Sequence, residues 1–227
     1  MDELICPDVF DGRVKAFFTK KPLGADIRKI ADILSIRRGN VYLPTQKHTD
    51  RVQVLNSTMD QEIADAVVTD RNGVLIGVKV ADCVPVLLFD RKNLVVGAVH
   101  AGWRGTAEKI TQKTISLMIK EYDSSPLDIR MALGPSIRGE CYQVDREVKD
   151  AICKATGDGD YYIQKDNKCY VDLPSANMLQ AISLGIPEEN IWVSSDCTYC
   201  LPENFYSYRY TKEYNGSQGG FIGIFSE

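Results

Sequence analysis

The stretch VLIGVKVADCVPVLLFDRKNLVVGAVHAGWRG, residues 74–105, decides the fold. It holds three short apolar runs, 74–80, 85–89 and 94–100, whose length and β-branched residues are typical of strands. The polar stretches 71–73 and 90–93 supply turn signals beside them. The first and last runs are apolar almost throughout, which predicts strands buried on both faces.

Further elements are predicted on either side of this stretch. Strands are expected at residues 51–55, 65–69, 129–133, 191–194 and 221–225. One helix is expected from Thr106, as N-cap, to Tyr122. Asp145 is expected to cap a helix to Ala155, and Asp172 one that ends at Gly185. These elements predict an α/β fold, with an extensive mixed sheet and surrounding helices as in α+β proteins.

Composition limits the partners and the compartment. The 227 residues suit a single domain, 1–227. Lys and Arg total 27 against 31 Asp and Glu, so no nucleic-acid or membrane partner is expected. Met1-Asp2-Glu3-Leu4 shows no signal-peptide pattern, and a cytoplasmic location is expected. The seven cysteines are then more readily thiols and ligands than disulfides. The sequence does not indicate an oligomeric state.

Polar clusters at residues 80–85 and 99–105 follow two of the predicted buried strands, where α/β proteins commonly place ligand sites. They contain Cys83 and His100, and His48 is the only other histidine of the chain. Two imidazoles and one thiolate could hold a zinc ion. Three protein ligands leave a fourth position for water or substrate, as in catalytic zinc sites.

Other interpretations of these residues remain open. Cys83 could be a nucleophile with His100 as its base, or simply a small buried side chain. Arg104, just before the expected helix start, could bind an anion or lie free on the surface. The pair Cys197 and Cys200 forms a CxxC motif that is structural, redox-active or metal-binding.

Motifs spread over most of the chain make the sequence similar to the YfiH/YlmD family. These motifs are Gln46-Lys47-His48, residues 64–69, 81–85, 100–105, 134–137 and 141–144, Asp172-Leu173, Cys197-Thr198 and residues 205–209. The resemblance implies a YfiH-like fold, which is also similar to the catalytic domain of cytotoxic necrotizing factor. It implies that His48, Cys83 and His100 are the metal ligands. Members are described as multicopper polyphenol oxidoreductases (laccases) or as purine nucleoside phosphorylases.

The resemblance also implies substrates: adenosine, inosine or methylthioadenosine with phosphate, and adenosine for deamination. A laccase by the usual route is disfavoured here, because a blue-copper centre alone takes two histidines and leaves none for a copper cluster. We therefore expect zinc, with copper possible. The expected catalytic residues are Cys83, Asp82 and Arg104, and the expected substrate-binding residues are Gln46, Trp103, Cys141 and Arg209.

Two departures from the family pattern concern the pocket. Gly216-Ser217 stands where the family usually has a Gly-Arg pair, and the usual Gly-rich N-terminal stretch is shortened to residues 19–24. Both affect the expected substrate preference more than the expected metal site. Two further hypotheses are a Cys83–His100 amide hydrolase in peptidoglycan editing and a metal-dependent structural module.

Overall fold

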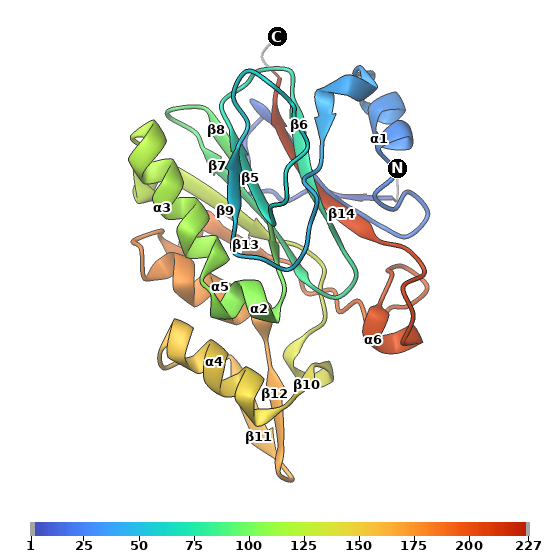
Figure 1. Cartoon of the computed structure of the whole chain (residues 1–227), viewed down its shortest axis with the longest axis vertical. Coiled ribbons are helices and arrows are strands. Elements are labelled where there is room, and N and C mark those ends of the chain that lie inside the picture. The colour runs from blue at the N-terminus through green and yellow to red at the C-terminus, as the bar shows by residue number, and fades with distance from the viewer. Residues whose placement is uncertain (1–2, 226–227) are drawn as a thin grey trace.

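The protein is described by a computed structural model covering residues 3–225 (Figure 1). Met1 and Asp2, which belong to the N-terminal stretch assessed for a signal peptide, lie outside these residues. Two mixed sheets are stacked face to face and helices cover the outer faces, so the predicted mixed α/β fold is confirmed. The division of the strands between two layers is a feature that the sequence analysis did not specify.

One layer is a six-stranded sheet. Its strand order is β13-β9-β7-β8-β5-β4. The four central strands β9, β7, β8 and β5 pair antiparallel with one another, and the edge strands β13 and β4 pair in parallel with β9 and β5. The bounds are β4 Val52–Val54, β5 Ala66–Thr69, β7 Val84–Asp90, β8 Val95–Ala101, β9 Ile129–Leu133 and β13 Ile191–Val193.

The second layer is a five-stranded sheet of order β1-β2-β14-β6-β3. Its bounds are β1 Leu4–Ile5, β2 Val14–Thr19, β3 Val41–Tyr42, β6 Leu75–Val80 and β14 Gln218–Ile224. A separate three-stranded sheet, β10-β12-β11, projects at one end of the molecule (Figure 1). It comprises β10 Gln143–Val144, β11 Tyr162–Lys165 and β12 Lys168–Val171.

Helices cover both outer faces of the stacked sheets. The α-helices are α1 Ile27–Leu34, α2 Trp103–Ala107, α3 Ile110–Tyr122, α4 Arg146–Thr156, α5 Leu173–Ile182 and α6 Tyr208–Thr211. Short 3₁₀ turns are η1 Arg38–Asn40, η2 Pro126–Asp128, η3 Gly139–Cys141 and η4 Glu188–Asn190. Helix α3 runs along the six-stranded sheet, and α1 lies on the opposite side of the molecule (Figure 1).

Alternating side chains of each central strand enter different cores, as the period of two requires. In β7, Val86 and Leu88 face the helices α3 to α5, whereas Leu87 and Phe89 face the other sheet. On the far side of the five-stranded sheet, residues such as Leu75 pack with α1. The prediction of strands buried on both faces is therefore confirmed for residues 74–80, apart from the exposed Lys79, and for residues 95–99.

The chain crosses from one sheet to the other at two places that matter for the site. Residues 81–83 connect β6 of the five-stranded sheet to β7 of the six-stranded sheet. Residues 43–51 likewise connect β3 to β4. Strands β7 and β8 pair with Val84 opposite Ala101, so the first crossing ends beside the carboxyl end of β8.

The expected helix start at Thr106 is wrong. Helix α2 begins at Trp103 after Gly102, and Lys109, in the left-handed conformation at φ 61°, separates it from α3. The Thr106 hydroxyl is buried inside α2 and accepts a hydrogen bond from the Asn177 amide at 2.9 Å. It therefore serves helix packing rather than capping.

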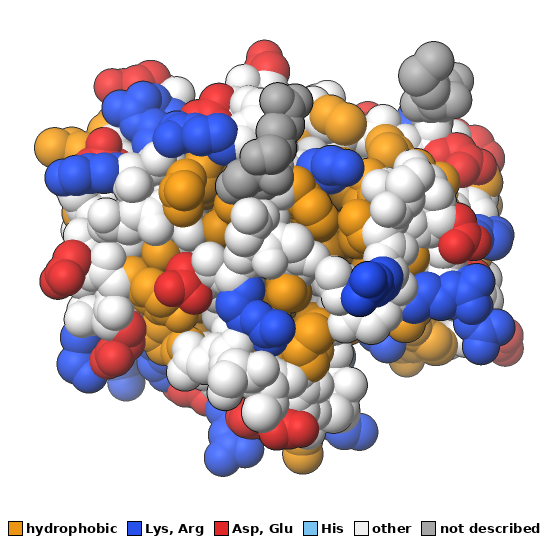
Figure 2. Space-filling model, turned by 90° about the horizontal axis from the view of Figure 1, so that it is seen from above, with side chains coloured by type: hydrophobic (Ala, Val, Ile, Leu, Met, Phe, Trp, Pro, Cys, Tyr) orange, Lys and Arg blue, Asp and Glu red, His pale blue; other side chains and the backbone are white. Residues whose placement is uncertain are grey.

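The Asp172 cap is confirmed, because its carboxylate accepts from the amide of Ser175 at 2.9 Å. Asp145 does stand at the N-cap position of α4, but its side chain forms no capping hydrogen bond. Helix α5 ends at Ile182, and Gly185 follows in the left-handed region. Within residues 3–225, no helix is both long and apolar enough to span a bilayer. On the face seen in Figure 2, basic and acidic side chains are interspersed without a continuous basic patch.

Candidate metal centre and active site

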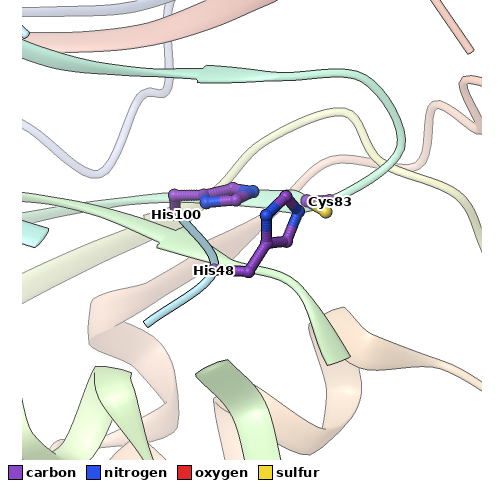
Figure 3. A group of neighbouring side chains, drawn as sticks. All are labelled: His48, Cys83 and His100. Atoms are coloured by element: carbon purple, nitrogen blue, oxygen red, sulfur yellow. The ribbon is translucent and has the colours of Figure 1, made fainter. Parts of the chain in front are cut away.

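Three segments bring His48, Cys83 and His100 together. His48 and Cys83 lie on the two crossings between the sheets, and His100 lies near the end of β8. One donor atom from each residue lies within 4.8 Å of the other two. The imidazole rings approach edge to face with centroids 4.8 Å apart, and the sulfur lies beside them (Figure 3). The sequence prediction that these side chains meet agrees with this arrangement.

A fully buried carboxylate, Asp65, orients the His100 ring and holds the backbone of His48. Its Oδ1 accepts hydrogen bonds from Nδ1 of His100 at 2.7 Å and from the amide of His48 at 3.0 Å. Its Oδ2 accepts from the amides of Lys47 and Thr49 and from the Thr49 hydroxyl. With Nδ1 of His100 engaged in this way, Nε2 is left to face the cluster, as in carboxylate–histidine–metal arrangements.

Asp65 was missed as a functional residue in the sequence, although residues 64–69 were noted. The available signal was a lone acidic residue directly before the apolar residues 66–68, which continue a predicted strand. A buried carboxylate requires partners, because an unpaired buried charge is too costly. Its position alone does not say which donors those partners are.

The three groups also adjust one another's ionisation. Burial raises the pKa of Cys83, but the neighbouring His100 and His48 outweigh it and lower that pKa to about 6. Burial lowers the pKa of His100, but Cys83 and Asp65 outweigh it and raise that pKa to about 9. Without a metal, both shifts favour a thiolate at Cys83 beside an imidazolium at His100, and binding of a metal would release the His100 proton.

The position of His48 separates a metal site from a simple nucleophile–base pair. Cys83, His100 and Asp65 alone would also suit a cysteine hydrolase, in which a carboxylate orients the base of the thiol. Such a triad has no need of a second imidazole at the sulfur. His48 nevertheless takes the left-handed backbone conformation, φ 58°, which is unfavourable for a residue other than glycine and is held here by Asp65. Three converging donors fit a zinc ion.

Gly102 leaves no space for a side chain beside the cluster. A Cβ atom there would lie 3.0 Å from the Cys83 sulfur and 3.3 Å from Cδ2 of His48. We expect Gly102→Ala to lower zinc affinity roughly 10- to 100-fold, the range seen when groups that orient metal ligands are disturbed. Competition with a chromogenic chelator measures this. Gly12→Ala, whose Cβ would meet nothing within 4 Å, is the matched control. Equal affinity in both variants would contradict the expectation.

The cluster forms one wall of a cavity of about 1190 Å³. Two arginines on its lining lie over aromatic rings: the Arg104 guanidinium is 4.4 Å from the Trp103 ring centroid, and that of Arg209 is 5.0 Å from Tyr142. No carboxylate within residues 3–225 forms a salt bridge with either guanidinium. The Arg209 guanidinium also donates to the Gln143 carbonyl at 2.8 Å. The cavity therefore combines aromatic surface with two guanidinium groups that form no salt bridge.

Asp82 and Gln46 also line this cavity, but their polar atoms are already engaged. The Asp82 carboxylate accepts from the Thr198 hydroxyl at 2.6 Å and from the amide of Arg209 at 2.7 Å. The Gln46 amide exchanges two hydrogen bonds of 2.8 Å with the backbone of Lys79. Both side chains thus hold segments of the cavity wall in place, and the expected roles in proton transfer and substrate binding stay predictions.

Cys141, the remaining expected substrate-binding residue, lines a different cavity of about 430 Å³. Cys197 and Cys200 line that cavity too. Within the described chain, the other expected residues Cys83, Arg104, Trp103 and Arg209 share the lining of the larger cavity with both histidines.

Fold and cluster together define a class of protein with a His–Cys–His group where two stacked mixed sheets are joined. Residues 20–225 match the model of the family described as multi-copper polyphenol oxidoreductase laccase. A purine nucleoside phosphorylase from Clostridium acetobutylicum is 36% identical over 203 residues, which cover 87% of this chain and 81% of the relative. Adenosine deaminase RL5, from an unknown prokaryotic organism, is 34% identical over 190 residues, covering 78% and 72%.

Among solved structures, YlmD from Geobacillus stearothermophilus matches with a TM-score of 0.91 at 27% identity, covering 99% of this chain and 97% of that one. The chain belongs to the YfiH/YlmD family.

Of the two departures from the family pattern, the one at the C-terminal end falls on the site. Ser217 lines the larger cavity. Gly216 beside it has φ 145°, and a Cβ there would lie 2.4 Å from the Tyr206 ring. The backbone at Gly216 therefore requires glycine, and Ser217 brings a hydroxyl to the cavity wall. That a guanidinium is usual at this position in the family stays an expectation from the sequence.

Proposed function

We propose that this protein is a zinc-dependent purine nucleoside phosphorylase with secondary adenosine deaminase activity. The observation that carries the proposal is the convergence of His48, Cys83 and His100 on a cavity that also presents aromatic rings and two arginines without a salt bridge. The donor set fits zinc, and zinc bound there would supply a Lewis acid at the cavity wall. The relatives named phosphorylase and deaminase support the same pair of activities.

Phosphorolysis requires phosphate, the nucleophile, and the nucleoside to bind side by side in the same cavity. A phosphate oxygen forms a bond to C1′ of the ribose while the C1′–N9 bond breaks, and the leaving purine takes up the electron pair and a proton. Arg104 and Arg209 are assigned to phosphate, because guanidinium groups bind phosphate oxygens through paired hydrogen bonds. Trp103 and Tyr142 hold these guanidinium groups against the wall through cation–π contacts.

The experiment incubates zinc-loaded protein with adenosine, with and without phosphate, and separates the products by chromatography. We expect adenine and ribose 1-phosphate only when phosphate is present, and inosine in either case. Inosine and methylthioadenosine should yield hypoxanthine and adenine with phosphate. If folded, zinc-loaded protein forms none of these products, the proposal is wrong.

Chelation separates this proposal from a Cys83–His100 amide hydrolase. Removal of metal should abolish both activities, and added zinc should restore them. In a cysteine hydrolase the thiolate and imidazolium act without metal, so chelation would leave activity unchanged while thiol alkylation would abolish it. Copper-loaded protein tested with a phenol provides the corresponding test of the oxidase description.

A further inference from the structure

A second group of sulfur ligands lies outside the cavity just described. Cys141, at the end of η3, meets Cys197 and Cys200 of the CxxC turn, and their three sulfurs lie within 4.8 Å of one another. All three line the smaller cavity of about 430 Å³. Neither the His48 cluster nor the proposed phosphorolysis uses these cysteines. From this arrangement we propose a second metal site, with three thiolate ligands for a thiophilic ion such as Zn²⁺ or Cu⁺.

The number and spacing of the sulfurs favour a metal over a disulfide. The sulfurs of Cys141 and Cys200 are 3.3 Å apart. That exceeds the bond of about 2.05 Å in a disulfide. It approaches the edge of about 3.8 Å in a tetrahedron whose metal–sulfur bonds are about 2.3 Å. A disulfide would use two of the thiols and leave the third without a role. Thiolates are the ligands that Zn²⁺ and Cu⁺ prefer.

The polypeptide around the sulfurs is fixed before any ion binds. The amide of Arg138 donates to the Cys197 sulfur at 3.4 Å, an arrangement that stabilises a thiolate. The Arg138 guanidinium donates to the Ser194 carbonyl at 2.7 Å and to Asp172 at 3.0 Å. The CxxC turn is closed by the amide of Leu201, which donates to the Cys197 carbonyl at 3.0 Å. Hydrogen bonds within the protein therefore hold Cys141 and the CxxC turn in position without a metal ion.

Three protein ligands leave one coordination position toward the cavity, in contrast to the four protein ligands of most structural zinc sites. The site would join residues 138–141 to the turn 197–200. That turn carries Thr198, whose hydroxyl donates to Asp82 beside Cys83. The second ion would thus support the segment that positions Asp82 at the larger cavity.

Titration of reduced, metal-free protein with Cd²⁺, followed by the ultraviolet absorption of cadmium–thiolate bonds, tests the proposal without any nucleoside. We use Cys83→Ser to remove the first site and expect one Cd²⁺ per chain to remain bound with strong thiolate absorption. The double variant Cys83→Ser/Cys200→Ser should lose saturable binding. Cys200 is exposed, so this change should not disturb folding. The matched control, Cys83→Ser/Cys6→Ser, changes another exposed cysteine and should keep the ion.

Three outcomes would overturn the second site: no Cd²⁺ bound by folded Cys83→Ser, equal binding by the two double variants, or a Cys141–Cys200 disulfide whose reduction yields no metal uptake. If Cys83→Ser fails to fold, His48→Ala serves as the background, because His48 is exposed. The result is independent of nucleoside turnover, so a failed phosphorylase assay would leave this test unaffected.

Discussion

Serine in place of Cys83 is expected to remove one zinc equivalent per chain and to reduce phosphorolysis more than about 100-fold. The change replaces a thiolate by a neutral hydroxyl that is a poor ligand at neutral pH. Loss of partners that merely orient metal ligands already costs 10- to 100-fold in affinity or activity. Loss of a ligand should cost more. The change also leaves His100 without the thiolate that raises its pKa.

Elemental analysis and product chromatography measure the two effects on the same preparation. Cys6→Ser, at an exposed cysteine that belongs to neither cluster, is the control and should match the unaltered protein. Far-ultraviolet circular dichroism establishes that the Cys83 variant is folded. A folded variant that keeps its full zinc content, or that turns over adenosine at the original rate, would rule out Cys83 as a ligand.

Asparagine in place of Asp65 is expected to lower zinc affinity roughly 10- to 100-fold and also to destabilise the metal-free protein. Oδ1 accepts two hydrogen bonds and Oδ2 accepts three, all from donors. In either orientation of the asparagine side chain, its NH₂ group would replace one of the two oxygens. That NH₂ group would then face at least two hydrogen-bond donors and could accept from neither. Each unsatisfied buried donor costs about 1–3 kcal/mol. The free energy of unfolding should thus fall by at least about 2 kcal/mol.

Urea unfolding of metal-free protein gives the stability change, and chelator competition gives the affinity change. Asp50→Asn is the matched control, because Asp50 is a partly exposed aspartate whose ion pair with Lys113 is solvent-accessible. Exposed pairs contribute about 0–1 kcal/mol. If the Asp65 and Asp50 variants bind zinc equally well, Asp65 does not orient the ligands.

The central strands could be predicted from the sequence because burial on both faces leaves an unmistakable apolar run. Burial on both faces also conceals which strands belong to which of the two sheets. Strands β6 and β7 are consecutive and equally apolar, yet they belong to different sheets. Nothing in their periodicity distinguishes a neighbour in one sheet from a neighbour in the next layer.

Helix α1 was missed although its signals are present. Asp26 caps it by accepting from the amides of Arg28 and Lys29, and Ile30 is among the residues it buries against the five-stranded sheet. At eight residues it is short, and local patterns of this length compete poorly with the stronger strand signals nearby. Strand β2 was missed as well, because Lys15 interrupts its apolar pattern at an exposed position.

The candidate metal ligands were predictable for a different reason. A chain with only two histidines offers few choices, and both lie in motifs beside strand ends. The second cluster was not predictable in the same way. The CxxC pair is visible in the sequence, but its third member, Cys141, comes from a distant segment that only the folded chain brings alongside.

Because of the two crossings between the sheets, a zinc ion bound at the proposed site would also have a mechanical consequence. His48 lies on one crossing and Cys83 on the other, while His100 lies near the end of β8 in the six-stranded layer. An ion bound by all three would link the two sheets at one end of the sandwich. Sliding of one sheet over the other would then require breaking coordinate bonds. Catalysis and resistance to shear would then depend on the same ion.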